Sequence, residues 1–186
     1  IDFISFMFSS LFFGIFTKKH DKIIVSSPQF LPVISGFILA KIKRVSFILE
    51  IRDLWPESMV ALGVMRKDNY IIRILDAIAK YIYRKSELIV VVTKTFKKYL
   101  VSLGIKEDKI IIIENGFNFN RTLAPDKSIK DIRKKYNIRN KNFTVSYIGT
   151  LGMSHGVEIM INTAKLISNV NFVIIGEGEQ KIYLKK

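Results

Sequence analysis

Short apolar runs rich in β-branched residues alternate along this chain with longer segments whose apolar residues recur at helical spacing. The spacing is clearest in residues 71–82, where Arg73, Asp76 and Lys80 mark the polar side. The strand-like runs are continuous rather than alternating, which is typical of parallel sheets with helices on both faces. In chain order these runs are residues 22–26, 45–51, 88–92, 109–113, 143–148 and 171–175. The pattern predicts an α/β fold with parallel sheets.

The composition of the chain changes between residues 117 and 142, where polar and charged residues dominate and Pro125 interrupts regular secondary structure. A chain of 186 residues can hold one domain or parts of two. We predict a first domain over residues 1–122, a linker over 123–141 with a short basic helix, and a second domain over 142–186. Because the sequence begins with Ile1 and ends without completing an element, we expect it to be a piece of a longer protein.

Charged side chains crowd into the connection that follows the run 45–51. Glu50, Arg52, Asp53 and Glu57 surround Trp55, the only tryptophan of the chain. In open parallel sheets, ligands bind at the carboxyl ends of the strands. Charges beside an indole are costly there unless they hold a polar ligand or one another. The segment is therefore a candidate site, and the alternatives are an Arg52–Asp53 pair that stiffens the loop and a Glu57 that caps the next helix.

A glycine-rich loop over residues 149–156 separates the strand-like run 143–148 from a predicted helix over 157–167. Glycines let backbone amides approach a phosphate, and a helix N-terminus adds partial positive charge. The alternative is a tight turn without a ligand. The spacing differs from Gly-x-Gly-x-x-Gly, and no acidic residue closes the next strand, so NAD is not the expected ligand.

The formal charge of +14 favours anionic partners such as a phosphorylated substrate or an acidic membrane face. Solvated lysine-rich surfaces are the alternative explanation. The sequence has no RNA-recognition or helix-turn-helix signature, so no nucleic-acid partner is expected. With no cysteine and only two histidines, the chain offers neither disulfides nor a Cys-based or His-rich metal centre.

Within the first sixteen residues, the run 3–16 is apolar on every side and is followed by the basic segment Lys18-Lys19-His20. The run is shorter than the ~20 residues that span a bilayer. A signal peptide would carry its positive charges before the apolar stretch. Two interpretations remain, a helix of the domain core or interface and a helix lying on an anionic membrane surface; the phenylalanines on every side favour the second.

Several motifs in one order carry a resemblance to a known family. They are Ser26-Ser27-Pro28, the segment from Glu50 to Ser58 with its Arg-Asp-Leu-Trp-Pro core, Leu62-Gly63, Glu114-Asn115-Gly116, Tyr147-Ile148-Gly149-Thr150-Leu151-Gly152 and His155-Gly156. This series resembles the retaining nucleotide-sugar glycosyltransferases of family 4, in the branch that builds bacterial capsule, O-antigen and colanic-acid-type polysaccharides, including fucosamine-transferase-like proteins. The resemblance covers nearly the whole chain.

The resemblance implies a GT-B fold with two Rossmann-like domains, both incomplete in this chain. It implies transfer of a sugar, with retention of configuration, from a nucleotide-diphospho-sugar to a saccharide acceptor that is often lipid-linked. No cofactor or metal ion is expected. Such an enzyme would lie in the cytoplasm, peripheral to the inner face of the cell membrane.

The resemblance also implies residue roles. Arg52 and Asp53 would be catalytic. The acceptor side of the site would comprise Trp55, Glu57, Asn115 and Gly116. The donor diphosphate would be bound by Gly149, Thr150, Gly152, His155 and Gly156, with Gly176 and Gly178 in a further donor-side loop. The loop differs from the family pattern at two places. His155 stands where many relatives carry Lys, and Thr150-Leu151 stands where many relatives carry Arg. These differences argue against a pair of positively charged side chains holding the diphosphate in this loop.

The family's paired-glutamate segment, which contacts the donor sugar and the ribose, is expected downstream of Gly178 and is not found before Lys186. The 186-residue chain alone is therefore expected to have little or no transferase activity. Two other functions stay open. One is a truncated or non-catalytic GT-B-like binding module, and the other is an enzyme resembling nucleotide-sugar 2-epimerases.

Overall fold

The structure is a computed structural model that describes residues 2–27, 29–117, 126–139 and 141–185. The chain divides into two compact units, Ile1–Gly116 and Phe117–Lys186. The domain boundary expected at residue 122 falls outside the described residues. The helix expected in the linker is present as α6 (Asp126–Lys135), and it belongs to the second unit.

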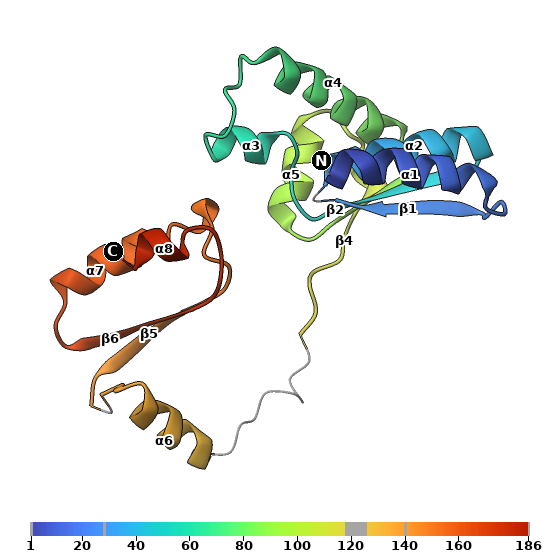
Figure 1. Ribbon diagram of the computed structural model, residues 1–186. Coiled ribbons are helices and arrows are strands. Elements are labelled where there is room, and N and C mark those ends of the chain that lie inside the picture. Colours follow the sequence, from blue (N-terminus) through green and yellow to red (C-terminus); the bar gives the residue numbers. More distant parts are fainter. Residues whose placement is uncertain (1, 28, 118–125, 140, 186) are drawn as a thin grey trace. The chain divides into compact units, whose positions relative to one another are not determined.

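A four-stranded parallel sheet forms the centre of the first unit (Figure 1). Its strands are β1 (Lys22–Ser26), β2 (Ser46–Ile51), β3 (Leu88–Val91) and β4 (Ile110–Ile112). They are adjacent in chain order, β1-β2-β3-β4, and each neighbouring pair is parallel. Every strand expected from the sequence in this unit is present, to within one residue at its ends.

Helices connect these strands, and local sequence signals set where several of them begin and end. The helices are α1 (Asp2–Phe16), α2 (Phe30–Lys43), α3 (Glu57–Ala61), α4 (Tyr70–Lys85) and α5 (Lys94–Ser102), with a 3-10 turn η1 (Glu107–Lys109). Asn69 caps α4 by accepting a hydrogen bond from the Ile71 amide at 2.8 Å, and Thr93 caps α5 through the Phe96 amide at 3.2 Å. Past the end of α2, Arg44 has the left-handed conformation that terminates many helices.

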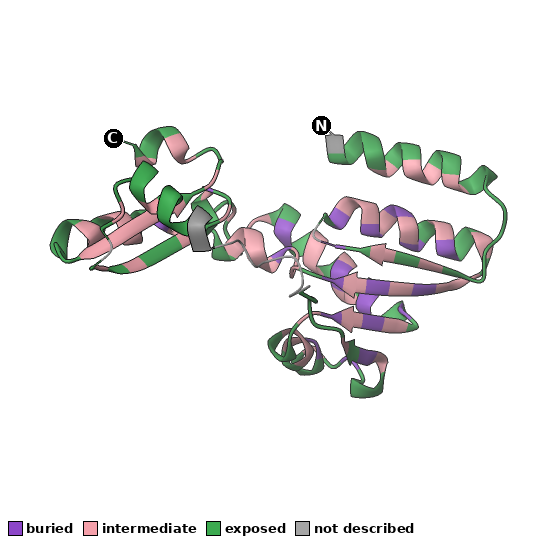
Figure 2. Ribbon diagram, turned by 90° about the horizontal axis from the view of Figure 1, so that it is seen from below, coloured by how far each residue is buried: buried purple, intermediate pink, exposed green. Residues whose placement is uncertain are grey.

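The core of the first unit lies on one face of the sheet. Phe47, Leu49 and Ile51 of β2 are buried there together with side chains of α2, α4 and α5. On the opposite face, Ile24 and Ile111 are 67% and 38% exposed. In Figure 2 the buried segments of this unit, in purple, lie on the strands and on the helices beside them. Coverage on both faces, which the sequence predicts, is not found in the described residues of this unit. The reason is topological, because right-handed crossovers that all advance in one direction along a sheet place every connecting helix on the same face.

Helix α1 packs on α2 through small and polar residues. The Ser10 and Ser35 hydroxyls are 3.0 Å apart, and Gly14 lies where a Cβ would be 2.6 Å from a methyl group of Leu39. The Lys43 ammonium closes the C-terminal end of α1 by donating to the Ile15 and Thr17 carbonyls at 3.2 and 2.6 Å. This contact with α2 agrees with the first interpretation of the N-terminal apolar run, a core or interface helix of the domain.

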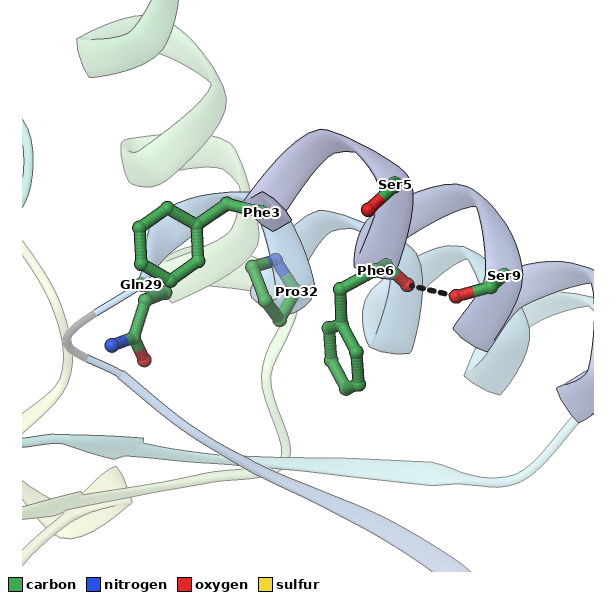
Figure 3. Close-up of a pocket in the computed structure, with 6 residues that line it drawn as sticks. All are labelled: Phe3, Ser5, Phe6, Ser9, Gln29 and Pro32. Carbon is green, nitrogen blue, oxygen red and sulfur yellow. Dashed lines mark hydrogen bonds between the residues drawn. The ribbon is translucent and has the colours of Figure 1, made fainter. Parts of the chain in front are cut away.

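All six phenylalanines of α1 stay exposed in spite of that contact. Phe8, Phe12, Phe13 and Phe16 are between 59% and 75% exposed. Figure 3 shows Phe3 and Phe6 at the open pocket that they line with Gln29 and Pro32. None of the helices in the described ranges is long and apolar enough to cross a membrane.

The second unit is built on two parallel strands, β5 (Phe143–Ile148) and β6 (Val170–Ile175), paired in register from Phe143 with Val170 to Ile148 with Ile175. The remaining elements are the 3-10 turn η3 (Met153–His155) and the helices α7 (Val157–Leu166) and α8 (Lys181–Leu184). This is the strand–loop–helix–strand arrangement expected from the sequence. Among the described residues of this unit, Leu151 and Val157 are the buried apolar side chains; Leu151 lies in the glycine-rich loop and Val157 directly follows it.

Candidate functional site

Arg52 follows the carboxyl end of β2 and contacts a residue that follows β4. Its Nη2 donates to Asn115 Oδ1 at 2.8 Å, and its Nη1 lies 3.9 Å from Glu50 Oε1. The guanidinium is about half exposed, so it remains accessible to a ligand. The structure thus brings together three residues of the predicted site at one edge of the sheet. Arg52 is paired with Glu50 and Asn115, and the expected alternative of an Arg52–Asp53 pair is not found among these described residues.

Ser27 holds the backbone of this segment in place. The side chain of Ser27 is buried, and its hydroxyl accepts from the Arg52 amide and donates to the Asp53 carbonyl, each at 3.2 Å. Its own amide donates to the Glu50 carbonyl at 2.8 Å. Asp53 in turn accepts from the Leu54 amide through Oδ1 at 2.9 Å. Ser27 therefore ties the loop after β1 to both candidate catalytic residues.

The segment after Asp53 turns into the helical layer. Trp55 packs against the core, its peptide bond to Pro56 is cis, and its carbonyl accepts from the Tyr83 hydroxyl at 3.4 Å. Glu57 is the first residue of α3 and does not cap it, because the cap position is Pro56 and no side chain of the described residues caps the helix. Its Oε1 instead accepts from the Tyr99 hydroxyl. Glu57 Oε2 is buried without a hydrogen-bond partner among the described residues.

Two tyrosines near Glu57 have perturbed acidity. Burial raises the pKa of Tyr99 above its ordinary value, and the hydrogen bond to Glu57 raises it further. The pKa of Tyr83 is raised first by burial and then by the negative charge of Glu57. Both phenols therefore stay protonated near neutral pH and keep their hydroxyl protons as donors.

In the second unit, the loops after β5 and β6 are joined backbone to backbone. The Gly149 amide donates to the Ile175 carbonyl at 3.0 Å, and the Leu151 amide donates to the Glu177 carbonyl at 2.8 Å. A Cβ added at Gly176 would lie 1.9 Å from the Gly149 carbonyl oxygen. Gly178 has a φ of 155°, and a Cβ added there would lie 2.4 Å from the Leu151 carbonyl oxygen. Gly176 and Gly178 are thus required for close packing of the two loops.

His155 lies beside the glycine loop that it follows. A Cβ at Gly152 would be 3.3 Å from His155 Nδ1, and the imidazole packs edge-on against Tyr147. The Tyr147 hydroxyl donates to the Thr150 carbonyl at 2.7 Å. Gly156 has φ of 57° and precedes α7 without a side-chain cap. The arrangement leaves amides of the first turn of α7 next to the loop, as an anion site would require.

The sequence did not predict the role of several residues that hold the Arg52 segment of the first unit or the glycine-rich loop of the second unit in place. Ser27 was noted only as part of a motif, although a serine that follows directly on a strand is a recognisable turn signal. Tyr83 and Tyr99 lie on helices where their spacing indicates core packing, and Tyr147 lies in a strand. The Tyr83 and Tyr147 hydroxyls donate to backbone carbonyls in irregular segments, and the Tyr99 hydroxyl donates to the side chain of Glu57. Periodicity along the chain does not reveal such contacts.

The part of the chain that the structure describes brings no three His, Asp or Glu side chains together as a possible metal site. The catalytic, acceptor and donor roles predicted for the residues of the Arg52 segment and of the glycine-rich loop stay predictions.

No protein-family profile matches this chain. Three curated proteins are similar to it. WbjE of Pseudomonas aeruginosa, assigned as a glycosyltransferase, is 24% identical over 148 residues, which are 75% of this chain and 35% of that protein. An uncharacterised glycosyltransferase of Methanocaldococcus jannaschii is 23% identical over 96% of this chain and 46% of its own length. WcaI of Escherichia coli, assigned to colanic acid biosynthesis as a glycosyl transferase, is 22% identical over 90% of this chain and 42% of its own length.

The fold is also similar to solved structures of HepE from Anabaena. The HepE complex with UDP and glucose superposes with a TM-score of 0.72 and 15% identity, over 97% of this chain and 46% of HepE. The complex with UDP-glucose gives a TM-score of 0.69 and 18% identity over 98% of this chain. The chain spans less than half the length of these relatives. The fold is therefore of the α/β GT-B type, and the chain is similar in sequence to curated glycosyltransferases.

Proposed function

We propose that this chain is part of a retaining, family 4-like glycosyltransferase that moves a sugar from a nucleotide-diphospho-sugar to a lipid-linked or other saccharide acceptor in bacterial surface polysaccharide synthesis. The observation that carries the proposal is the group formed by Arg52, Asp53 and Asn115 at the carboxyl edge of the first sheet. Ligands of open parallel sheets bind at this edge. The assignment of WcaI to colanic acid biosynthesis supports the choice of pathway class.

The donor would bind to the second unit. Gly149, Thr150, Gly152 and Gly156 form a loop that leads into α7, and the first amides of that helix supply donors and partial positive charge for a diphosphate. His155 lies beside this loop and would add a further donor to a phosphate oxygen. Stabilisation of the departing nucleoside diphosphate is the chemical contribution of such a site. HepE, whose fold is similar, was solved with UDP-glucose, which supports a nucleotide-sugar donor.

The acceptor would bind to the first unit. One carboxylate oxygen of Asp53 accepts from the Leu54 amide, and the other would accept a hydrogen bond from the acceptor hydroxyl and orient it. Arg52, fixed by Asn115 and half exposed, would stabilise negative charge that develops in the reaction. Trp55 and Gly116 would complete the acceptor side. No metal ion is assigned to this chemistry.

We further propose that the protein lies on the cytoplasmic face of the cell membrane. The exposed phenylalanines of α1 would enter the headgroup region, and the basic residues Lys18 and Lys19, which follow α1, would contact anionic lipids.

The test uses the full-length gene product with UDP-, GDP- and ADP-sugars. A nucleotide-sugar that binds the folded protein raises its melting temperature, because binding stabilises the native state by RT ln(1 + [L]/Kd). The Asp53→Asn variant should keep this shift, since Asp53 lies in the acceptor unit, but lose sugar transfer to a lipid-linked saccharide. Absence of a shift with every nucleotide-sugar would contradict the proposal.

A further inference from the structure

A further cavity lies in the first unit, next to the candidate catalytic segment. It has a volume of about 930 Å³ and is bounded by α3, α4 and α5. Pro56 and Glu57, at its wall, follow Asp53 by three and four residues.

The unsatisfied oxygen of Glu57 gives this cavity a specific chemical requirement. Tyr99 donates to Oε1, whereas Oε2 is shielded from solvent and has no partner among the described residues. A buried polar atom without a partner is destabilising, and a carboxylate more so. A ligand that enters the cavity and carries a hydroxyl or amide hydrogen would supply the missing donor, with a small rotation of the Glu57 side chain.

The lining residues carry positive and negative charges in equal formal number. Lys67, Arg73 and Lys80 carry three positive charges, and Glu57, Asp68 and Asp76 carry three negative charges, so the formal sum is zero. Lys80 is already paired with Asp76 at 2.7 Å, and Asp68 holds Arg66 through two contacts of 3.1 and 3.0 Å. The groups left to a ligand are the carboxylate of Glu57 and the cations of Lys67 and Arg73.

Apolar side chains separate these groups. Val60, Ile72 and Leu103 line the same cavity, and Ile72 is buried. A surface that alternates acceptors, donors and apolar patches, without net charge, matches the hydroxyls and C–H faces of an uncharged sugar. With those pairs formed, a phosphate would meet the Glu57 carboxylate beside the two cations, and an amine would meet the two cations beside that carboxylate.

We propose that this cavity binds a neutral saccharide unit of the acceptor, with Glu57 accepting from a sugar hydroxyl and Arg73 and Lys67 donating to others. The proposal rests on the transferase function proposed above and identifies where the acceptor binds. Glu57 and Arg73 would then help determine which acceptor is used. Tyr99 acts through Glu57 as a positioning residue, since its hydroxyl orients the carboxylate.

The experiment is ligand-observed NMR on the full chain, by saturation transfer to methyl glucoside and methyl N-acetylglucosaminide. Inorganic pyrophosphate and ethylammonium serve as the anionic and cationic probes. A saccharide signal is expected with the wild-type chain. It should fall about tenfold in Glu57→Gln, because a charge-assisted hydrogen bond is lost, and remain unchanged in Glu87→Gln, an exposed control outside the cavity.

A steric pair of variants localises the binding. Ala61→Trp places an indole in the cavity from an exposed position and should abolish the saccharide signal, whereas Ala77→Trp, at an exposed position outside the lining, should leave it intact. Circular dichroism confirms that both variants fold. A saccharide signal that survives Ala61→Trp, or stronger binding of pyrophosphate or ethylammonium than of either sugar, would overturn the proposal.

UDP-glucose is titrated into the same samples. If UDP-glucose binds and the saccharides do not, the acceptor cavity is wrong while the transferase proposal stands. If the saccharides bind at the cavity and no nucleotide-sugar binds to the full-length gene product, the cavity is a sugar site and the transferase proposal fails.

Discussion

Arg52 Nη2 donates to Asn115 Oδ1 at 2.8 Å, although the two residues are 63 positions apart in the chain. The contact joins the loop after β2 to the segment after β4 across the edge of the sheet. It holds a half-exposed guanidinium in one orientation, which a charge-stabilising role requires.

Replacing Asn115 should impair transfer more than stability. In Asn115→Ala the guanidinium loses its neutral partner and keeps, among the described side chains, Glu50 at 3.9 Å. We expect sugar transfer by the full-length gene product to fall about tenfold, equivalent to ~1.4 kcal/mol of transition-state stabilisation. The free energy of unfolding should change by less than ~0.5 kcal/mol, as for most exposed substitutions. Wild-type transfer rates in this variant would show that the contact has no catalytic consequence.

Removing the buried hydroxyl of Ser27 should destabilise the first unit. In Ser27→Ala the Arg52 amide and the Asp53 carbonyl each lose a partner. The loss of hydrogen bonds at a buried position costs about 1–3 kcal/mol, measurable by urea denaturation. The matched control is Ser26→Ala, at the exposed end of β1, which should cost less than half as much. Equal effects of the two substitutions would contradict the role assigned to Ser27.

Gly176 should tolerate no side chain. In Gly176→Ala the new methyl group would lie 1.9 Å from the Gly149 carbonyl oxygen, so the loops after β5 and β6 must separate. We expect a loss of at least about 2 kcal/mol in stability of the second unit. Gly116→Ala is the control, because nothing lies within 4 Å of its added Cβ, and it should be near neutral for stability. Hydrogen exchange of the Gly149 and Leu151 amides distinguishes the two.

The stability of the first unit should decrease at alkaline pH. The pKa of Tyr99 is raised by burial and by Glu57, whereas in the unfolded chain a tyrosine ionises near pH 10. Above about pH 10, the unfolded state therefore loses protons that the folded state retains, and the free energy of unfolding falls as pH rises. Below that pH this stabilisation is fully present. Tyr99→Phe should make the decrease less steep, while Tyr70→Phe, at a side chain that is 74% exposed, should leave it unchanged. Denaturation curves measured over this pH range would contradict the prediction if the free energy of unfolding of the wild type and of Tyr99→Phe falls equally steeply with pH.

Membrane binding of α1 should depend on its exposed phenylalanines and also on the positive charges of the lysines that follow it. The wild-type chain is expected to sediment with vesicles that contain an anionic lipid, and less so as salt is raised. Phe12→Ser with Phe13→Ser removes exposed apolar area, and Lys18→Glu with Lys19→Glu reverses the basic flank. Each double variant should weaken binding severalfold. Equal binding to neutral and anionic vesicles by all forms would contradict the membrane interpretation.

Periodicity was sufficient to predict the strands and longer helices, since the β-branched runs of β1 and β5 match the observed strands residue for residue. The coverage of the first sheet on one face followed from strand order, which periodicity does not contain. The charged group around Arg52 was predicted from its position after a strand. Its partner in the hydrogen bond, Asn115, was named separately, and only the parallel pairing of β2, β3 and β4 brings the two together.

What the sequence determined by itself was local: where strands and helices form, where glycines permit tight turns, and which connections carry charge. These follow from short-range sterics and from the burial pattern of neighbouring residues. The tertiary structure decided which of the charged residues meet, that Ser27 and Tyr99 hold them, and that Glu57 faces a cavity with an unpaired oxygen. Those contacts depend on strand order and on the packing of helices distant in sequence, because a hydrogen bond requires its two atoms within about 3 Å and no pattern along the chain specifies that distance.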